Sequence, residues 1–389
     1  MRASTDSCAE PIFPTKSVTT AIGDRLCFQI RENETQDEAS GRLLWKLGFS
    51  VPRYDHEYQI LRNRIAEFKA IVLQVPPRLT EEDRARIRSV GVNLFVSVEK
   101  FLTDLLTFNV WLLASDHFAT THFTYTLQDA IKSVASTLGS EIASGDQMLS
   151  WRIDGENALG TLLGYLGAFR KWLKARPDAD RSAVKRKGED YPYYAQDPCW
   201  TFPFAHVELW ADVPQGVLAL YIETIESIST QLAQAELASV RNGLDHNRDE
   251  AGFPAPDKML ACVSRLEQAV DLSDSRRVIP KLYWRVSENR DLHGQVADSF
   301  RDYRNCTFEL CGPSPVRGPD RGAFGVPYLI APADFLNIPN STLMFRASPR
   351  TQWREYWNNY PRRRFIPPRS PGAEVLVSYD HPPAAQEDA

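Results

Sequence analysis

Apolar residues recur every three or four positions through most of the first 275 residues, and this spacing constrains the fold more strongly than any other feature of the chain. Such spacing predicts helices that each bury one face. Prolines lie in the connecting stretches after residues 74, 174 and 245, and few of the connecting stretches alternate between apolar and polar residues as a strand would. We expect six helices, over residues 56–74, 80–113, 127–138, 157–174, 214–245 and 256–271.

The helix expected from residue 80 has the clearest start. Thr80 and Asp83 have the spacing of a capping box, in which each residue satisfies a backbone amide of the other. Apolar residues form one stripe along this helix. The charged residues between them, Glu99, Lys100 and Asp104, are expected to point away from that stripe into solvent.

The helix expected over residues 157–174 contains Gly160, Gly164 and Gly167. Glycine lowers helix propensity, so its use here predicts the close approach of another backbone. A phosphate-binding loop is not indicated, because no strand precedes these glycines and no Lys-Ser or Lys-Thr pair follows them.

Beyond about residue 275 the pattern changes to short β-rich runs separated by Gly and Pro. Strands are expected over residues 281–286, 306–310, 328–331, 342–345 and 374–379, with a short helix over residues 353–357. The expected organisation is an irregular N-terminal arm (1–50), a helical domain (51–275), a β-rich C-terminal module (276–370) and a tail (371–389). The predicted fold is therefore mainly α, an antiparallel helical bundle with a smaller β-containing C-terminal module.

The composition limits the classes of function. A net charge of −5 argues against a general nucleic-acid coat protein, which needs excess Lys and Arg, so any nucleic acid must bind a local basic surface. The six cysteines are scattered, so we expect neither a disulfide framework nor a zinc site. No cofactor is expected. A chain without a disulfide framework is expected in the reducing cytoplasm. Asp116, His117 and His122 lack the spacing of a usual metal-ligand set. No apolar run reaches the about 18 to 20 residues of a membrane span, so no membrane association is expected.

The most basic stretch of this acidic chain runs from residue 170 to residue 187, where eight Lys or Arg residues face only two Asp residues. Lys185, Arg186 and Lys187, at its end, are expected to bind RNA by attracting its phosphate groups. The alternative is a solvated loop, which is the usual state of a charged run.

Residues 241–246 read Arg-Asn-Gly-Leu-Asp-His and end the helix expected over 214–245. This stretch places two groups suited to phosphodiester cleavage close together. The guanidinium of Arg241 can hold phosphate oxygens, and the imidazole of His246 can carry a proton near neutral pH. On a continuous helix, residues five apart diverge by roughly 140°. Gly243 is therefore expected to break or bend the helix between them.

The arrangement resembles the HEPN superfamily, helical domains whose ribonuclease members carry an Arg, a short spacer and then a His, often with a polar residue after the Arg. Arg241, Asn242 and His246 match that pattern, and the resemblance covers at most about half of the chain. It implies a metal-independent endoribonuclease that leaves 2′,3′-cyclic phosphates. In this role His246 is the general acid or base, Arg241 stabilises the charge on the phosphate, and Asn242 orients one of these groups.

The resemblance also implies partners. RNA is the substrate, and a homodimer brings two motifs into one composite site, because cleavage by this route uses both an acid and a base. A toxin or antiviral-defence role, with a neutralising or sensor protein, is a family-level expectation. Two alternatives stay open: a non-catalytic HEPN module that binds nucleotide, RNA or a partner protein, and an interaction protein without HEPN kinship whose Arg241 and His246 merely end a helix.

Overall fold

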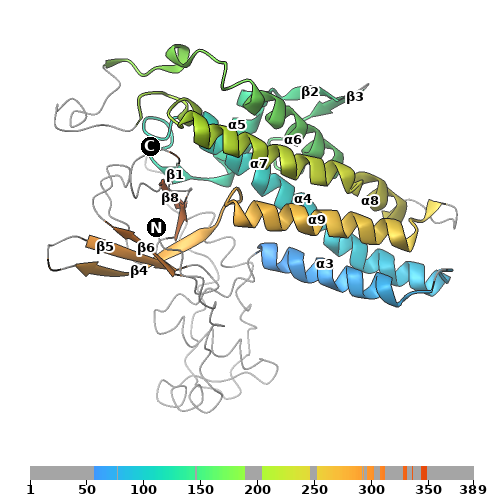
Figure 1. Cartoon of the computed structure of the whole chain (residues 1–389). Helices are drawn as coiled ribbons and strands as arrows, with labels where there is room; N and C mark the ends of the chain where they lie inside the picture. The colour runs from blue at the N-terminus through green and yellow to red at the C-terminus, as the bar shows by residue number, and fades with distance from the viewer. Residues whose placement is uncertain are drawn as a thin grey trace, which may run out of the picture.

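The structure is a computed structural model, and it describes residues 57–76, 78–144, 147–188, 204–245, 252–290, 292, 296–301, 307–311, 327–330, 335 and 343–347. Outside the described residues lie the arm expected over 1–50, the helix expected over 353–357, the strand expected over 374–379 and the tail expected over 371–389. The described part is mainly helical with small sheets, as Figure 1 shows. This confirms the prediction of a mainly α fold with a smaller β part.

The helices lie side by side in one elongated bundle (Figure 1). They are α3 Glu57–Gln74, α4 Glu81–Ala114, α5 Leu127–Leu138, α6 Leu159–Lys174, α7 Gln215–Gln234, α8 Leu237–Asp245 and α9 Pro256–Ser275. Apart from the helix expected over 214–245, each predicted helix is confirmed, with its ends within a few residues of the expected ones. No helix in the described part of the chain is both long enough and apolar enough to cross a membrane.

α4 is the central element of the bundle and contacts α3, α5, α6 and α8. Its 34 residues extend over about 51 Å. The predicted capping box is present: the Asp83 amide donates to Thr80 Oγ1 (3.1 Å), and the Thr80 amide donates to Asp83 Oδ2 (3.0 Å). Because α4 is so long, groups near its two ends belong to separate regions of the surface.

Two of the three charged residues expected to point into solvent from α4 are half-buried. Lys100 is exposed as expected, whereas Glu99 and Asp104 are partly covered. Asp104 accepts a hydrogen bond from Tyr58 Oη (3.3 Å), and burial raises its pKa to about 6. The prediction is wrong for Glu99 and Asp104 because neighbouring helices cover α4 well beyond its apolar stripe.

The helix expected over residues 214–245 is two helices, α7 and α8, and the break does not lie at Gly243. Ala235 ends α7, and Glu236 adopts a φ of +50°, in the left-handed region that commonly ends a helix. α8 then starts as the Val240 amide donates to Glu236 O (3.1 Å). The chain therefore changes direction before the motif, and the described part of the motif lies within α8.

Two of the glycines of α6, Gly160 and Gly167, are not closely approached by another backbone. A Cβ on Gly160 or Gly167 would meet no atom within 4 Å, so the prediction is wrong there. Gly91 of α4 and Gly243 of α8 permit close approach instead, since a Cβ on either would overlap a neighbour, at 2.7 and 2.8 Å respectively.

Within the described residues, six strands form one sheet in the order β1-β8-β7-β4-β5-β6. The strands are β1 Thr124–Tyr125, β4 Leu282–Arg290, β5 Val296–Arg301, β6 Thr307–Cys311, β7 Pro327–Ile330 and β8 Met344–Ala347. β4, β6, β7 and β8 overlap the expected strands, whereas β1 and β5 were not predicted. Nor was the hairpin of β2 Glu141–Ser144 and β3 Gln147–Ser150.

The sheet is joined to the end of the bundle where α4 finishes. β1 follows α4 in the chain and pairs in parallel with β8, while the other neighbouring strands are antiparallel. Phe345 of β8 packs edge-on against Trp111 of α4, with ring centroids 4.9 Å apart. The β-rich segments thus share buried apolar contacts with the helices.

Candidate functional site

α8 carries the described part of the motif and packs against the first half of α4 (Figure 1). Arg88 Nε donates to Leu244 O (2.7 Å), and the missing side chain of Gly91 leaves room for Leu244. On another side of α8, a Cβ on Gly243 would lie 2.8 Å from Pro254 Cγ. Gly243 therefore lets the segment before α9 pack closely on α8. The expectation that Gly243 breaks the helix is wrong.

Arg241 lies on the partly exposed side of α8, with 36% of its side-chain surface accessible. Its Nε lies 3.3 Å from Asp245 Oδ2, one helical turn further on. In the described part of the chain, no residue forms a hydrogen bond or ion pair with its terminal Nη groups. Asn242 is exposed beside it, and His246 lies outside the described residues. Of the three expected catalytic residues, the structure thus places two on one accessible surface.

Glu99 of α4 is a neighbour of this site that the sequence analysis did not identify. Burial raises the pKa of its carboxyl, while the charge of Arg241 and a hydrogen bond from the Leu159 amide act against that shift. Ala158, the N-cap of α6, makes no side-chain cap, so the Glu99 carboxylate serves the start of α6. No local sequence signal could reveal this role, because α4, α6 and α8 meet only in the folded chain.

The charges around Arg241 define what it can do. Asp245 forms an ion pair with Nε of the Arg241 guanidinium, and the Glu99 carboxyl on α4 adds negative charge near it. The Nη edge stays available, and its planar pair of donors matches two oxygens of a phosphate group. Within the described residues, no three His, Cys, Asp or Glu side chains are grouped as metal ligands. On this surface the Nη edge of Arg241 is therefore the group that can bind an anion, and two carboxylates lie beside it.

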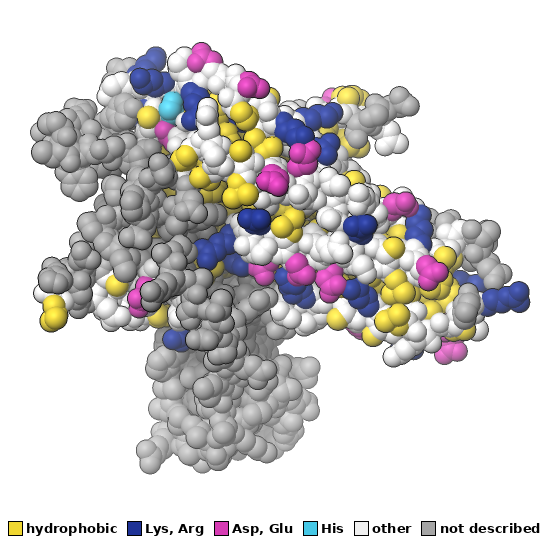
Figure 2. Space-filling view, viewed as in Figure 1, with side chains coloured by type: hydrophobic (Ala, Val, Ile, Leu, Met, Phe, Trp, Pro, Cys, Tyr) yellow, Lys and Arg dark blue, Asp and Glu magenta, His cyan; other side chains and the backbone are white. Residues whose placement is uncertain are grey.

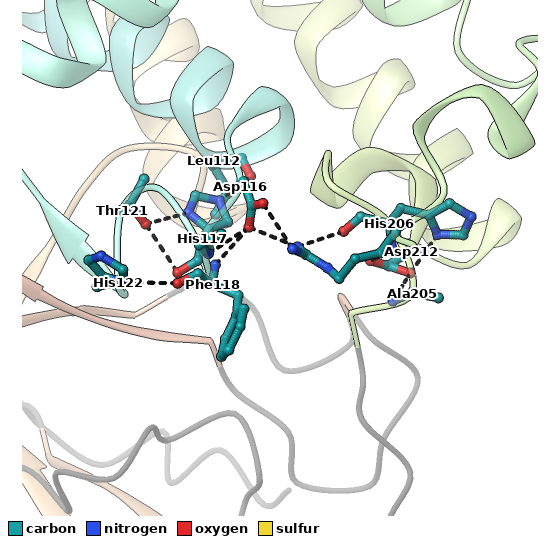
Figure 3. Close-up of polar contacts among 11 residues, drawn as sticks. Leu112, Asp116, His117, Phe118, Thr121, His122, Ala205, His206 and Asp212 are labelled. Carbon is teal, nitrogen blue, oxygen red and sulfur yellow. Dashed lines mark hydrogen bonds and ion pairs between the residues drawn. The ribbon is translucent and has the colours of Figure 1, made fainter. Parts of the chain in front are cut away.

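The three cations expected to bind RNA do not share one environment. Arg186 is 2% exposed, and it donates from Nη1 to Asp116 Oδ2 (2.9 Å) and from Nη2 to Asp116 Oδ1 (2.7 Å) and His206 O (3.1 Å). Figure 3 labels the two partners, Asp116 and His206, and draws these bonds to them as dashed lines. Burial acts to raise the pKa of Asp116, but the bonds from Arg186 and from two backbone amides hold it below its ordinary value. Arg186 is thus an internal structural residue, whereas Lys185 and Lys187 are exposed.

Most of the preceding basic stretch is also engaged in contacts within the chain. Lys174 pairs with Glu226 of α7. The Arg176 guanidinium lies over the ring of Trp210 (5.1 Å), and Arg181 donates to two backbone carbonyls at 3.0 and 3.3 Å. The stretch is therefore neither a solvated loop nor a continuous cationic surface.

The two histidines that follow α4 have structural roles. His117 is buried beside Trp111 and Phe345, and its Nε2 bonds Leu112 O (2.7 Å). Burial lowers the pKa of His117 to about 4, so its ring is neutral at pH 7. His122 is exposed and bonds a backbone carbonyl through Nδ1 (3.0 Å).

Comparisons with protein-family models, with curated proteins and with solved structures found no match. A function for this chain therefore has to be argued from its own residues. The end of α8 combines the partly exposed guanidinium of Arg241 with the neighbouring exposed amide of Asn242.

Proposed function

We propose that this chain is a metal-independent endoribonuclease of the HEPN type, with its active site at the end of α8. Arg241 binds the scissile phosphate and stabilises its developing charge, and Asn242 orients the phosphate by hydrogen bonds. His246 transfers protons. The resemblance of residues 241–246 to the HEPN motif supports the proposal, as does the position of its described residues, 241–245, in a helical bundle.

The observation that carries the proposal is the setting of the Arg241 side chain. Asp245 Oδ2 lies 3.3 Å from Arg241 Nε, and the Nη pair has no partner among the described residues. A guanidinium held at one edge keeps a fixed fork for two phosphate oxygens and loses less side-chain freedom when RNA binds.

The chemical step is a transesterification within the RNA. A base removes the 2′-hydroxyl proton, the 2′-oxygen attacks the adjacent phosphorus, and the bond from phosphorus to the 5′-oxygen breaks. An acid gives that oxygen a proton, so the products carry a 2′,3′-cyclic phosphate and a 5′-hydroxyl. One His per motif supplies either the acid or the base, so a site made by two chains around a two-fold axis provides both.

An exposed apolar strip on α4 supports such a dimer. Val92 is 44% exposed and Val96 is 57% exposed, and they lie one helical turn apart. Glu99, whose carboxyl interacts with Arg241, lies three residues further on and shares this side of the helix. A second copy of the chain packed on Val92 and Val96 would bring its own α8 close to Arg241.

Cleavage of labelled RNA in EDTA tests the proposed activity. The wild type should cleave, His246→Ala should not, and Arg241→Lys should lose at least about tenfold in rate, because a point charge does not reproduce the planar fork. Arg152→Lys is the matched control, since Arg152 also pairs with an acidic residue four positions on. RNA that stays intact with the wild-type chain would favour a non-catalytic binding module instead.

The dimer has its own test. Activity per chain should fall on dilution through the dissociation constant, and an excess of His246→Ala chains should suppress wild-type activity beyond simple dilution. Val96→Lys should weaken both self-association and cleavage. Activity per chain that stays constant where sizing shows only monomer would exclude the composite site.

A further inference from the structure

Arg176 lies just beyond the end of α6 and has no part in the proposed cleavage. Its guanidinium contacts two indole rings, with Cζ 4.5 Å from the ring centroid of Trp172 and 5.1 Å from that of Trp210. Its Nε donates to the Trp172 carbonyl (3.2 Å). Trp172 belongs to α6, and Trp210 belongs to the short helical turn η4 Leu209–Ala211. Three contacts from two elements therefore hold this guanidinium in one orientation.

The two indole rings that contact Arg176 are themselves held in place. Phe169 stacks against Trp172, with ring centroids 5.9 Å apart and ring planes 20° apart. Trp210 is 1% exposed, and its indole nitrogen donates to the carboxylate of Glu208. Arg181 donates to two backbone carbonyls in and after η4, at 3.0 and 3.3 Å, and so fastens η4 to the segment that follows α6. The Arg176 guanidinium thus has less freedom than that of an ordinary surface arginine.

The other edge of this guanidinium is available to a ligand. The two Nη groups of Arg176 form no hydrogen bond or ion pair within the described part of the chain, and neither is among its buried unpaired atoms. They present a planar pair of donors that matches two oxygens of one phosphate group. Arginine stays protonated throughout the physiological pH range, so this edge is cationic at any such pH.

The charges near Arg176 also favour an anion. Lys171 is exposed and has no ion-pair partner among the described residues, whereas Lys174 pairs with Glu226. Asp178 follows two positions after Arg176 and forms no ion pair with it. On the face of the molecule shown in Figure 2, Lys and Arg side chains lie scattered among acidic and apolar ones. The feature that stands out is therefore one oriented guanidinium, not a continuous basic surface.

We propose that Arg176 binds a phosphate group through its two Nη donors, with Lys171 adding positive charge. Each Nη group donates to one phosphate oxygen, and the contacts with Trp172 and Trp210 keep the donors in place before the ligand arrives. Little side-chain freedom is then lost on binding. The phosphate belongs either to a mononucleotide or to the backbone of an RNA strand. The proposal does not depend on cleavage at α8, because Arg176 is not part of that site.

The test follows the indole N–H resonance of Trp172 by NMR in the full-length chain at constant ionic strength, with Trp172→Phe used to assign it. The probes are inorganic phosphate, AMP and a short 2′-O-methyl RNA, which has no free 2′-hydroxyl and therefore cannot be cleaved by the proposed route. Acetate is the comparison anion. We expect at least one phosphate probe to shift the resonance saturably, and acetate to bind at least about tenfold more weakly than that probe.

Three variants test which side chains bind the phosphate. Arg176→Lys should weaken binding by at least about tenfold, because a point charge does not reproduce the planar fork. Lys171→Met should weaken it by about threefold. Arg78→Met is the matched control, since it removes the same charge from an exposed arginine before α4, and it should leave the affinity unchanged.

The outcomes separate the two sources of phosphate and can overturn the proposal. Saturation by AMP or inorganic phosphate assigns the site to a small phosphate ligand, and saturation by RNA alone assigns it to a strand backbone. The proposal is overturned if no phosphate probe shifts the resonance saturably, if acetate binds as tightly as phosphate, or if Arg176→Lys binds as tightly as the wild type. Circular dichroism shows whether each variant is folded, and if Arg176→Lys is not, the exposed-site variant Lys171→Met decides in its place. Because His246→Ala retains every group of this site, failure of the nuclease proposal leaves this result unaffected.

Discussion

Replacing Arg186 with Met tests whether this residue is a structural anchor rather than a contact for RNA. The change removes two hydrogen bonds to Asp116 and one to His206 O. It also leaves the Asp116 carboxylate, whose side chain is 10% exposed, without its counter-ion. Removing one partner of a buried ion pair costs about 3 to 5 kcal/mol. Asp116 would keep its bonds from the amides of Phe118 and Ala119, so we expect a loss near the lower limit, about 3 kcal/mol.

The assay is urea unfolding at pH 7, followed by tryptophan fluorescence and far-ultraviolet circular dichroism. Lys185→Met is the matched control, because the neighbouring lysine is exposed, and it should change the free energy of unfolding by no more than about 0.5 kcal/mol. Asp116→Asn combined with Arg186→Met should be more stable than Arg186→Met alone, since no unpaired charge then stays buried and the Asn oxygen can still accept from the amides of Phe118 and Ala119. The reasoning fails if Arg186→Met and Lys185→Met unfold with the same midpoint and slope.

Gly243→Ala should destabilise the chain by about 1 to 3 kcal/mol, because the new Cβ would lie 2.8 Å from Pro254 Cγ. Gly167→Ala, with open space around it, should instead stabilise by about 0.5 to 1 kcal/mol, and equal urea midpoints for the two variants would contradict both expectations. The pKa of buried His117 is lowered from 6.5 to about 4, so its contribution to stability is complete above pH 6.5 and is lost progressively as the pH falls from 6.5 through 4. That difference corresponds to about 3 kcal/mol. Between pH 7 and pH 4, the free energy of unfolding in urea should therefore fall less steeply for His117→Gln than for the wild type. Parallel curves of this free energy against pH would refute the role of His117.

The sequence predicted those parts of the fold that depend on local chemistry. The start of α4 follows from Thr80 and Asp83, whose reciprocal bonds span three residues. The helices follow from apolar spacing, because a helix that buries one face needs an apolar residue at every turn. The break at Glu236 was missed, since a left-handed residue other than glycine leaves no clear sequence signal.

The environment of the candidate site depends on contacts between distant segments, which the sequence did not reveal. Glu99 lies beside Arg241 only because α4 and α8 pack together through Gly91 and Leu244. Arg186 looks like its lysine neighbours in sequence, and its partner Asp116 is seventy positions away. Charge patterns alone could not divide the basic stretch into buried and exposed residues.

The central claim is that RNA is cleaved at the end of α8 by attack of its own 2′-hydroxyl. The most direct test is mass spectrometry of the product ends after the chain has acted in EDTA on one RNA of defined sequence. We predict fragments that end in a 2′,3′-cyclic phosphate, and none when His246→Ala replaces the wild type or when the RNA is fully 2′-O-methylated. Cleavage that persists with His246→Ala or with the methylated RNA would contradict the claim.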